Sequence, residues 1–205
     1  MAHRITTIIF DLYNTLIYNK STNPYGRMFV ELGTTSKEEM RICQVENFSS
    51  LSDLSQRLAP GKTIDTSVYE KELADDLGRA QVFHDVFPNL QRLKDHGYRL
   101  CLISNLATPY KRPFFDLGLD KYMDLVVFSC DAGAMKPEPE IYYNAISKLG
   151  ISPREAVMTG DSVWCDYLGP KAVGMNAVHL DRDGKNLFHC RGECITTLDD
   201  LFWFV

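Results

Sequence analysis

The second half of the chain alternates between strand-like and helical segments, and this alternation restricts the fold more than any other feature. From about residue 86, apolar runs of strand length recur in "YRLCLIS", "DLVVFS", "EAVMTG" and "NAVHL", with helical segments between them. An apolar, β-branched run at residues 4–10 adds one more strand. Neighbouring strands that are joined by helices pair in parallel, because a parallel pair needs a long crossover. We therefore predict an α/β fold with a parallel sheet covered by helices on both faces.

Residues 17–84 interrupt this alternation with a helical pattern. One of the segments, "SKEEMRICQVENF", opens with a capping box that Ser36 and Glu39 can form. Other segments of the same stretch carry helix start signals or apolar residues at helical spacing. We predict a small all-helical subdomain that is inserted into a core made of residues 1–16 and 85–205.

Polar side chains follow four of the predicted strands at the point where each strand ends. In chain order they are Asp11, Ser104, Asn105, Lys136, Asp161 and Asp166. Ligands of open parallel sheets bind beyond the carboxyl ends of the strands, so we expect these side chains to meet at one edge. Each residue alone could be an ordinary cap or turn former. Four strand ends with complementary carboxylate, hydroxyl, amide and ammonium groups together indicate a functional site.

The charge and composition exclude several classes of partner. The 205 residues have a formal net charge of −5 and no long run of Lys or Arg, so we expect neither nucleic acid nor a membrane surface as a partner. No segment approaches the roughly 18 apolar residues of a membrane span, and the first apolar run is too short for a secretory signal. The six cysteines follow no pairing rhythm. We expect reduced thiols and a cytoplasmic protein.

The stretch "HCRGEC" brings His189, Cys190 and Cys194 close together in the sequence. A structural zinc site normally needs CxxC-type pairs and a fourth ligand, and neither is evident here. We therefore expect a polar loop with incidental thiols rather than a metal site.

Four stretches, "FDLYNTL", "LISN", "MKPEPEIY" and "GDSVWCD", resemble in order and rough spacing the motifs of the haloacid dehalogenase superfamily. The resemblance spans residues 5–181, and the helical stretch after the first motif is similar to the α-helical cap of that superfamily. It implies a Rossmann-like core, an aspartyl nucleophile and an active site that the cap closes.

The resemblance implies a role for each polar residue of the core. Asp11 matches the nucleophile, which would attack phosphorus and form an aspartyl-phosphate. Thr15 matches a threonine whose hydroxyl orients that carboxylate. Ser104 and Asn105 match donors to phosphoryl oxygen atoms, and Lys136 matches the base that neutralises developing charge.

The resemblance also implies a magnesium site. Asp161 matches a metal-ligand carboxylate, and Asp166 matches its supporting partner. In the family the other protein ligand is a backbone carbonyl at the position of Tyr13. Carboxylates as close as Asp11 and Asp161 would repel each other, and a divalent cation resolves this. Mg²⁺ suits the position, because it prefers hard oxygen ligands and retains waters that a substrate phosphate can replace.

Tyr13 departs from the pattern of the family's phosphatases, which usually have an aspartate there as general acid and base. Such help is worth about 10² to 10⁴ in rate, and a tyrosine with an ordinary pKa near 10 is a poor substitute. The "DLYNTL" form instead resembles the 2-haloacid dehalogenases, whose halide leaves without a proton. Those enzymes use no metal and hold the substrate carboxylate with a cap arginine; Arg27 and Arg41 are the arginines to consider here.

We expect the aromatic residues of the helical stretch to pack its helices rather than line a substrate pocket; they are Tyr18, Tyr25, Phe29 and Phe48. Trp164 lies between the two aspartates of "GDSVWCD", and we expect it to pack beneath that loop. The sequence does not indicate which residues set specificity.

Three functions remain open. The sequence favours a Mg²⁺-dependent phosphatase for a small phosphorylated metabolite, because "GDSVWCD" keeps both Asp161 and Asp166, which the dehalogenases typically lack. The second is a metal-independent 2-haloacid dehalogenase, as the tyrosine of the first motif suggests. The third is a non-catalytic descendant that binds phosphoryl groups. The sequence indicates neither the substrate nor the oligomeric state.

Overall fold

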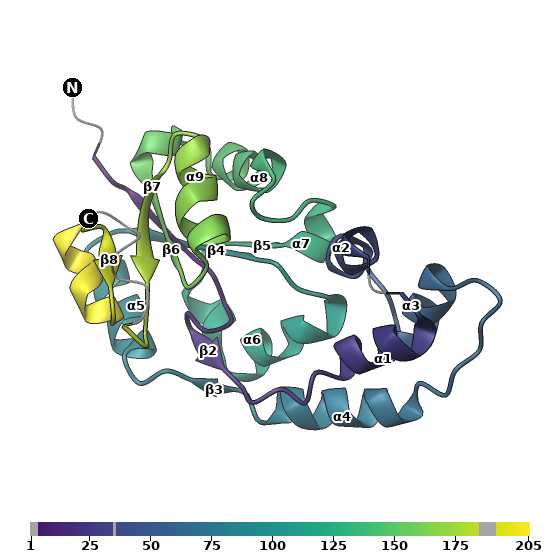
Figure 1. Cartoon of the computed structure of the whole chain (residues 1–205). Coiled ribbons are helices and arrows are strands. Elements are labelled where there is room, and N and C mark those ends of the chain that lie inside the picture. The colour runs from purple at the N-terminus through teal and green to yellow at the C-terminus, as the bar shows by residue number, and fades with distance from the viewer. Residues whose placement is uncertain (1–3, 35, 185–191) are drawn as a thin grey trace.

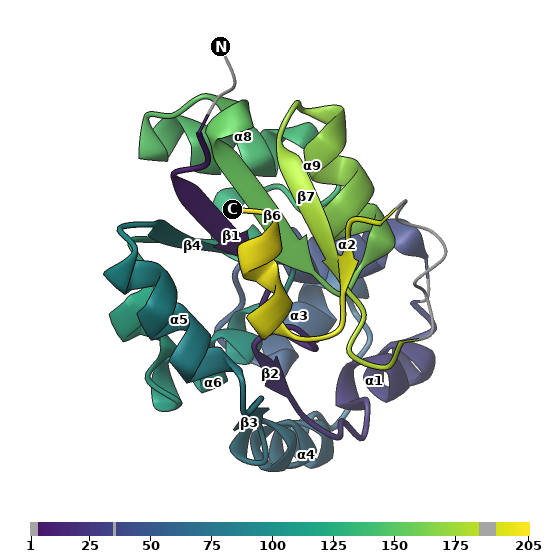
Figure 2. The ribbon, with the colours of Figure 1, turned by 90° about the vertical axis from the view of Figure 1, so that its left-hand side faces the viewer.

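A six-stranded parallel sheet forms the centre of the computed structural model, which describes residues 4–34, 36–184 and 192–205. Its strand order is β5-β4-β1-β6-β7-β8 (Figure 1), and Figure 2 shows β1 between β4 and β6. The strands are β1 (Thr7–Phe10), β4 (Arg99–Ser104), β5 (Leu125–Phe128), β6 (Ala156–Gly160), β7 (Asn176–Leu180) and β8 (Cys194–Ile195). The predicted α/β fold with a parallel sheet is confirmed.

Helices cover both faces of this sheet (Figure 1). One face carries α5 (Val86–Asp95), α6 (Arg112–Asp116) and a 3₁₀-helix, Leu198–Trp203. The other carries α8 (Pro139–Leu149) and α9 (Gly169–Ala172), and α7 (Ser129–Ala132) follows β5. In β1, Ile8 and Phe10 pack with the α5 face and Ile9 packs with the α8 face. All three are fully buried, as expected for a strand covered on both sides.

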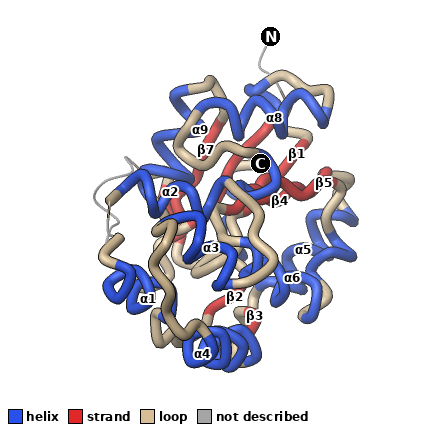
Figure 3. The backbone as a smooth tube through the Cα atoms, turned by 90° about the vertical axis from the view of Figure 1, so that its right-hand side faces the viewer, coloured by secondary structure: helices blue, strands red, loops and turns tan. Residues whose placement is uncertain are grey.

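Residues between β1 and β4 build a second group of helices with an apolar core of its own. The helices are α1 (Pro24–Leu32), α2 (Lys37–Val45), α3 (Leu51–Leu58) and α4 (Ser67–Gly78), and Figure 3 views the molecule from their side. The side chains of Ser36 and Glu39 form the predicted capping box at the start of α2. Met28, Leu54 and Leu73 bring α1, α3 and α4 together in this core.

Two short strand pairings were not predicted from the sequence. The predicted all-helical stretch of residues 17–84 contains an antiparallel ribbon of β2 (Ile17–Tyr18) and β3 (Gln81–Val82). The predicted loop around Cys194 contains β8, which pairs with β7, while His189 and Cys190 lie outside the described residues. Strands of two residues carry no readable alternation, so the pattern could not indicate them.

No helix in the described part of the chain has the length and apolar character that crossing a bilayer requires. Cys43, Cys101, Cys130 and Cys165 carry free thiols. That the protein's thiols are reduced stays a prediction from the sequence.

A buried ion pair fastens the loop after β1 to the rest of the core. Arg182, just beyond β7, donates to the backbone carbonyl of Thr15 at 3.2 and 2.6 Å and to Asp85 at 3.0 Å. Asp85 also accepts from the Thr197 hydroxyl at 2.9 Å and from the Leu198 backbone at 2.8 Å. Burial alone would raise the pKa of Asp85, but these donors, Arg182 foremost, outweigh it and hold the pKa below its ordinary value.

We expect Asp85→Asn to lower the free energy of unfolding by about 3 kcal/mol at pH 7, because the substitution leaves a largely buried Arg182 without its counter-charge. Chemical denaturation measures this. Asp116→Asn is the matched control. Asp116 and its partner Arg112 are both more than half exposed, so loss of this ion pair should lower the free energy of unfolding by less than about 0.5 kcal/mol.

The loss of stability in Asp85→Asn should depend on pH and become smaller in acid. The folded pKa of Asp85 is lower than the unfolded one, so its ionised form stabilises the fold above about pH 4, and this contribution is lost as the pH falls further. The difference between wild type and Asp85→Asn should therefore shrink below about pH 4. Equal effects of the two variants at pH 7 would contradict this account of the ion pair.

Candidate active site

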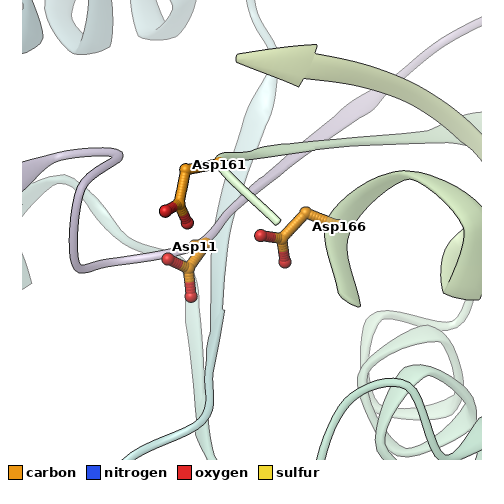
Figure 4. Close-up of side chains that lie close together, drawn as sticks. All are labelled: Asp11, Asp161 and Asp166. Carbon is orange, nitrogen blue, oxygen red and sulfur yellow. The ribbon is translucent and has the colours of Figure 1, made fainter. Parts of the chain in front are cut away.

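Side chains from separate strand ends meet at the carboxyl edge of the sheet. Asp11 directly follows β1, Asp161 directly follows β6, and Asp166 lies one turn further on. Figure 4 shows their three carboxyl groups converging, and one oxygen atom from each lies within 4.8 Å of the others. The convergence predicted from the sequence is observed.

Lys136 lies at the centre of this cluster with only 2% of its side chain exposed. Its Nζ donates to Asp11 Oδ1 at 2.7 Å, to Asp166 Oδ1 at 2.7 Å and to the backbone carbonyl of Ile103 at 2.8 Å. All three N–H bonds of the ammonium group are thus used. Burial would lower the pKa of Lys136, but the charges of Asp11 and Asp166 outweigh it and hold the pKa above its ordinary value. The lysine is therefore a permanent cation.

Two hydroxyl groups orient the Asp11 carboxylate. Ser104 donates to Asp11 Oδ1 at 3.1 Å, and Thr15 donates to Oδ2 at 3.5 Å. The position of Thr15 agrees with the orienting role that the sequence suggested. Ser104 was expected to face a phosphoryl oxygen, and in this structure its hydroxyl is on Asp11 instead. Because Oδ1 accepts from both Lys136 and Ser104, Oδ2 is the less engaged oxygen of Asp11.

Asn105 holds the backbone of Lys136 on both sides of that residue. Its Oδ1 accepts from the Lys136 N–H at 2.7 Å, and its Nδ2 donates to the Lys136 carbonyl at 2.7 Å. The sequence analysis expected only a phosphoryl contact and missed this positioning role. One N–H of the amide remains for such a contact.

Asp161 is the most open carboxylate of the three. It accepts from Nδ2 of Asn14 at 3.2 Å, a contact that the sequence analysis did not foresee. Asn14 adopts a positive φ of 59°, which asparagine tolerates better than most residues. Burial and the nearby charge of Asp11 raise the pKa of Asp161.

Asp166 is almost fully buried beside the strand end. It lies in a π-helical turn, Val163–Leu168, where the sequence predicted an ordinary helix. Its two oxygens accept from Lys136 and from the backbone N–H of Ser162. A Cβ atom at Gly160 would lie 2.4 Å from the Asp166 carboxyl carbon, so only glycine fits there. Burial raises the pKa of Asp166, Asp11 adds to the rise, and the Lys136 charge opposes it.

The arrangement can hold a hard divalent cation. Three carboxylates and one ammonium group carry a combined charge of −2 when ionised, and oxygen donors are the ligands that Mg²⁺ and Ca²⁺ prefer. Asp11 Oδ2 and Asp161 are the carboxylate positions open to such an ion. Asp166, which the sequence placed among the metal residues, has both oxygens engaged and fits a supporting role.

The Tyr13 hydroxyl donates to the backbone carbonyl of Tyr110 at 3.1 Å. Burial, together with Tyr110, raises the pKa of Tyr13 above its ordinary value. A hydroxyl that is committed to a carbonyl and hard to ionise cannot readily exchange protons with a substrate. That Tyr13 is a poor general acid stays a prediction.

The two arginines considered for a substrate carboxylate are bound to protein carboxylates. Arg27 pairs with Glu72 at 2.6 Å, and Arg41 pairs with Glu138 at 2.7 Å. Neither lines the hollow of about 190 Å³ that contains Asp11. The arginine that would bind the carboxylate of a haloacid is therefore not provided by either residue.

Trp164 is 71% exposed, so the expectation that it packs beneath its loop is wrong. Trp164 lies two positions before the buried Asp166, and side chains two apart in a helical turn point to opposite sides. Tyr25 also differs from its prediction, because besides packing on Phe29 it lines a cavity next to the site.

Comparison with known proteins points to one enzyme family. A family model described as haloacid dehalogenase-like hydrolase matches residues 5–174. The chain is 35% identical over 101 residues to a glyceraldehyde 3-phosphate phosphatase of Methanopyrus kandleri, an alignment that covers 49% of this chain. It covers 43% of that relative, so the chain spans less than half of the relative's length.

Solved structures with this fold include a phosphatase and a 2-haloacid dehalogenase. A HAD phosphatase from Thermococcus onnurineus superposes with a TM-score of 0.69 at 29% identity, over 96% of both chains. A 2-haloacid dehalogenase from Pseudomonas syringae pv. Tomato DC3000 superposes with a TM-score of 0.68 at 22% identity, over 97% of both chains. The second likeness shows the shared fold alone.

We expect a divalent cation to stabilise the folded protein through Asp161. Millimolar MgCl₂ should raise the midpoint of thermal unfolding, since a ligand that binds only the folded state stabilises it. Asp161→Asn should remove most of this shift, and Asp116→Asn, which alters an exposed carboxylate elsewhere, should keep it. Because the pKa of Asp161 is raised, protons should compete with the cation and the shift should weaken as the pH falls. An unchanged shift in Asp161→Asn would contradict the site.

Proposed function

Because this chain belongs to the haloacid dehalogenase-like hydrolases, we propose that it is a Mg²⁺-dependent phosphatase for a small phosphorylated metabolite, with Asp11 as the nucleophile. The observation that carries the proposal is the carboxylate cluster around Lys136. Its excess negative charge is costly to bury without a divalent cation, and a metal-independent dehalogenase would have no use for it. The relatives named as phosphatases support the same choice.

The residues of the cluster fit two successive displacements at phosphorus. Asp11 Oδ2 attacks the phosphorus atom, and the bond to the leaving alkoxide breaks. Water then attacks the aspartyl-phosphate, which frees the Asp11 carboxylate and inorganic phosphate. Lys136 contacts Asp11 Oδ1 and so holds the nucleophile in place. The remaining N–H of Asn105 can donate to a phosphoryl oxygen.

A bound Mg²⁺ would be held by Asp11, Asp161 and the backbone carbonyl of Tyr13, with Asp166 in support. It would supply positive charge to the phosphoryl group when bound. We also propose that residues 17–84 act as a cap over residues 1–16 and 85–205. A cytoplasmic location stays a prediction from the cysteine pattern.

Tyr13 restricts which esters this site can hydrolyse. Its hydroxyl is bound to the Tyr110 carbonyl, so the leaving oxygen must take its proton from water or from the substrate itself. Esters with good leaving groups depend less on such a proton. We therefore propose faster turnover of acyl and aryl phosphates than of simple alkyl phosphates.

The dehalogenase alternative has less support. Its "DLYNTL" motif is present, but Arg27 and Arg41 are paired with Glu72 and Glu138, and the cluster keeps Asp161. Halide release from 2-chloropropionate in EDTA would establish it. The non-catalytic alternative predicts binding of Mg²⁺ and a phosphate analogue without turnover of any ester.

The nucleophile is tested by Asp11→Asn in a phosphate-release assay with Mg²⁺ and acetyl phosphate or 4-nitrophenyl phosphate. We expect activity to fall to background, because the amide is not a nucleophile at phosphorus. Residual activity near that of the wild type would contradict the role of Asp11. An unchanged unfolding midpoint in saturating phosphate would show that the variant is folded.

The missing acid is tested by Tyr13→Asp on an alkyl phosphate. We expect the rate to rise by about 10²-fold, and by much less on 4-nitrophenyl phosphate, whose leaving group needs no proton. Tyr13→Phe is the matched control: it keeps the ring that packs edge-on against Tyr110 and should stay within about threefold of the wild type. A loss of more than about tenfold in Tyr13→Phe would show that the hydroxyl takes part in catalysis.

A further inference from the structure

A cavity of about 410 Å³ adjoins the Asp11 site beneath helices α1 and α2. It shares Tyr13 and Asn105 with the smaller hollow that contains Asp11. A phosphoryl group that is attacked by Asp11 would therefore extend its leaving group into this cavity. The volume is in the range of small-molecule sites in proteins.

The described residues that line this cavity include no Asp, Glu, Lys, Arg or His. The lining therefore has no side chain of a type that is commonly charged at pH 7. Burial raises the pKa of the lining groups Cys43 and Tyr110 to about 12, so both stay neutral at pH 7. The nearby Arg41 is bound to Glu138 outside the cavity. A carboxylate that entered would lose its water without gaining a counter-charge, which is unfavourable.

Aromatic rings form one wall of the cavity. Tyr25 lies between Tyr110 and Phe29, with ring centroids 5.5 and 6.1 Å apart, and Tyr13 packs edge-on against Tyr110 at 5.8 Å. Such a surface suits a ring, because ring-on-ring contact adds to the burial of apolar area. Met40 of α2 also lines the cavity and offers an adaptable apolar contact.

Amide side chains supply the polar part of the lining. Asn19 and Gln44 both line the cavity. Asn19 Nδ2 is buried and has no hydrogen-bond partner among the described residues. An unpaired buried donor costs free energy, and this one belongs to a residue that lines the cavity, where an acceptor on a ligand could satisfy it.

We propose that the leaving group of the substrate is a neutral alcohol with a ring and a hydrogen-bond acceptor, not a hydroxy acid. The proposal rests on the phosphatase function proposed above and narrows its substrate class. It follows from an uncharged lining, an aromatic wall and an unpaired amide donor. Phosphorylated carboxylic acids are excluded by the absence of a cation in the lining, and haloacids are excluded for the same reason.

The test compares two aryl phosphates that differ in charge at one position, 4-carbamoylphenyl phosphate and 4-carboxyphenyl phosphate. Calorimetric binding to Asp11→Asn with saturating Mg²⁺ avoids turnover. We expect the carbamoyl ester to bind at least about tenfold more tightly, because only the carboxylate must be buried unpaired. Equal affinities, or tighter binding of the carboxylate, would overturn the proposal.

A cation placed in the lining should reverse the preference. Gln44→Arg should raise the affinity for the carboxyphenyl ester by at least about tenfold, while Gln44→Met, of similar length and without charge, should not. The same comparison with the free products, 4-hydroxybenzamide and 4-hydroxybenzoate, as inhibitors of the wild type covers the case in which Asp11→Asn does not fold. Failure of Gln44→Arg to favour the anion would also overturn the proposal.

A separate assay, the hydrolysis of phenyl phosphate by the wild type, tests the phosphatase function. Its result distinguishes a failure of the phosphatase function from a failure of the leaving-group proposal. Turnover of phenyl phosphate without a preference for the neutral ester would refute the leaving-group proposal and leave the phosphatase standing. A clear preference in binding without turnover of any ester would refute the phosphatase and support the selectivity of the cavity for neutral groups.

Discussion

The buried ammonium group of Lys136 is the interaction on which the candidate site depends. It binds Asp11 after β1 and Asp166 in the turn after β6, and it donates its third hydrogen to the Ile103 carbonyl in β4. Without it, two carboxylates of like charge would be buried with no counter-charge, which is unfavourable. Asn105 holds the lysine in place through its backbone. A single cation thus compensates the buried carboxylates and joins three strand ends.

Much of this arrangement could be predicted, because the signals were local or set by topology. The alternation of strands and helices required a parallel sheet, and a parallel sheet brings the carboxyl ends of its strands to one edge. Asp11, Lys136 and Asp161 are far apart in the chain, yet strand ends alone were enough to place them together. The capping box of Ser36 and Glu39 was readable because helix starts depend on neighbouring residues.

The rest could not be predicted, because it depends on contacts between distant backbone groups or on very short elements. The ribbon of β2 and β3 and the strand β8 have two residues each, too few for a periodic signal. The bond from Tyr13 to the Tyr110 carbonyl and the clamp of Asn105 on Lys136 use backbone atoms, which carry no sequence signal. Trp164 was misplaced because the side of the turn that faces the core is set by the burial of Asp166, two positions later, and not by the aromatic residue itself.

The proposed chemistry rests on two features. The cluster around Lys136 could hold a divalent cation beside a phosphoryl group, and we propose that Tyr13 leaves the departing alcohol without a built-in proton donor. The most direct measurement is the identification of a covalent adduct by mass spectrometry after acid quench of the wild type with acetyl phosphate and Mg²⁺. The account predicts a phosphoryl group on Asp11. Phosphate release with no adduct on Asp11, or with the adduct on another residue, would contradict it.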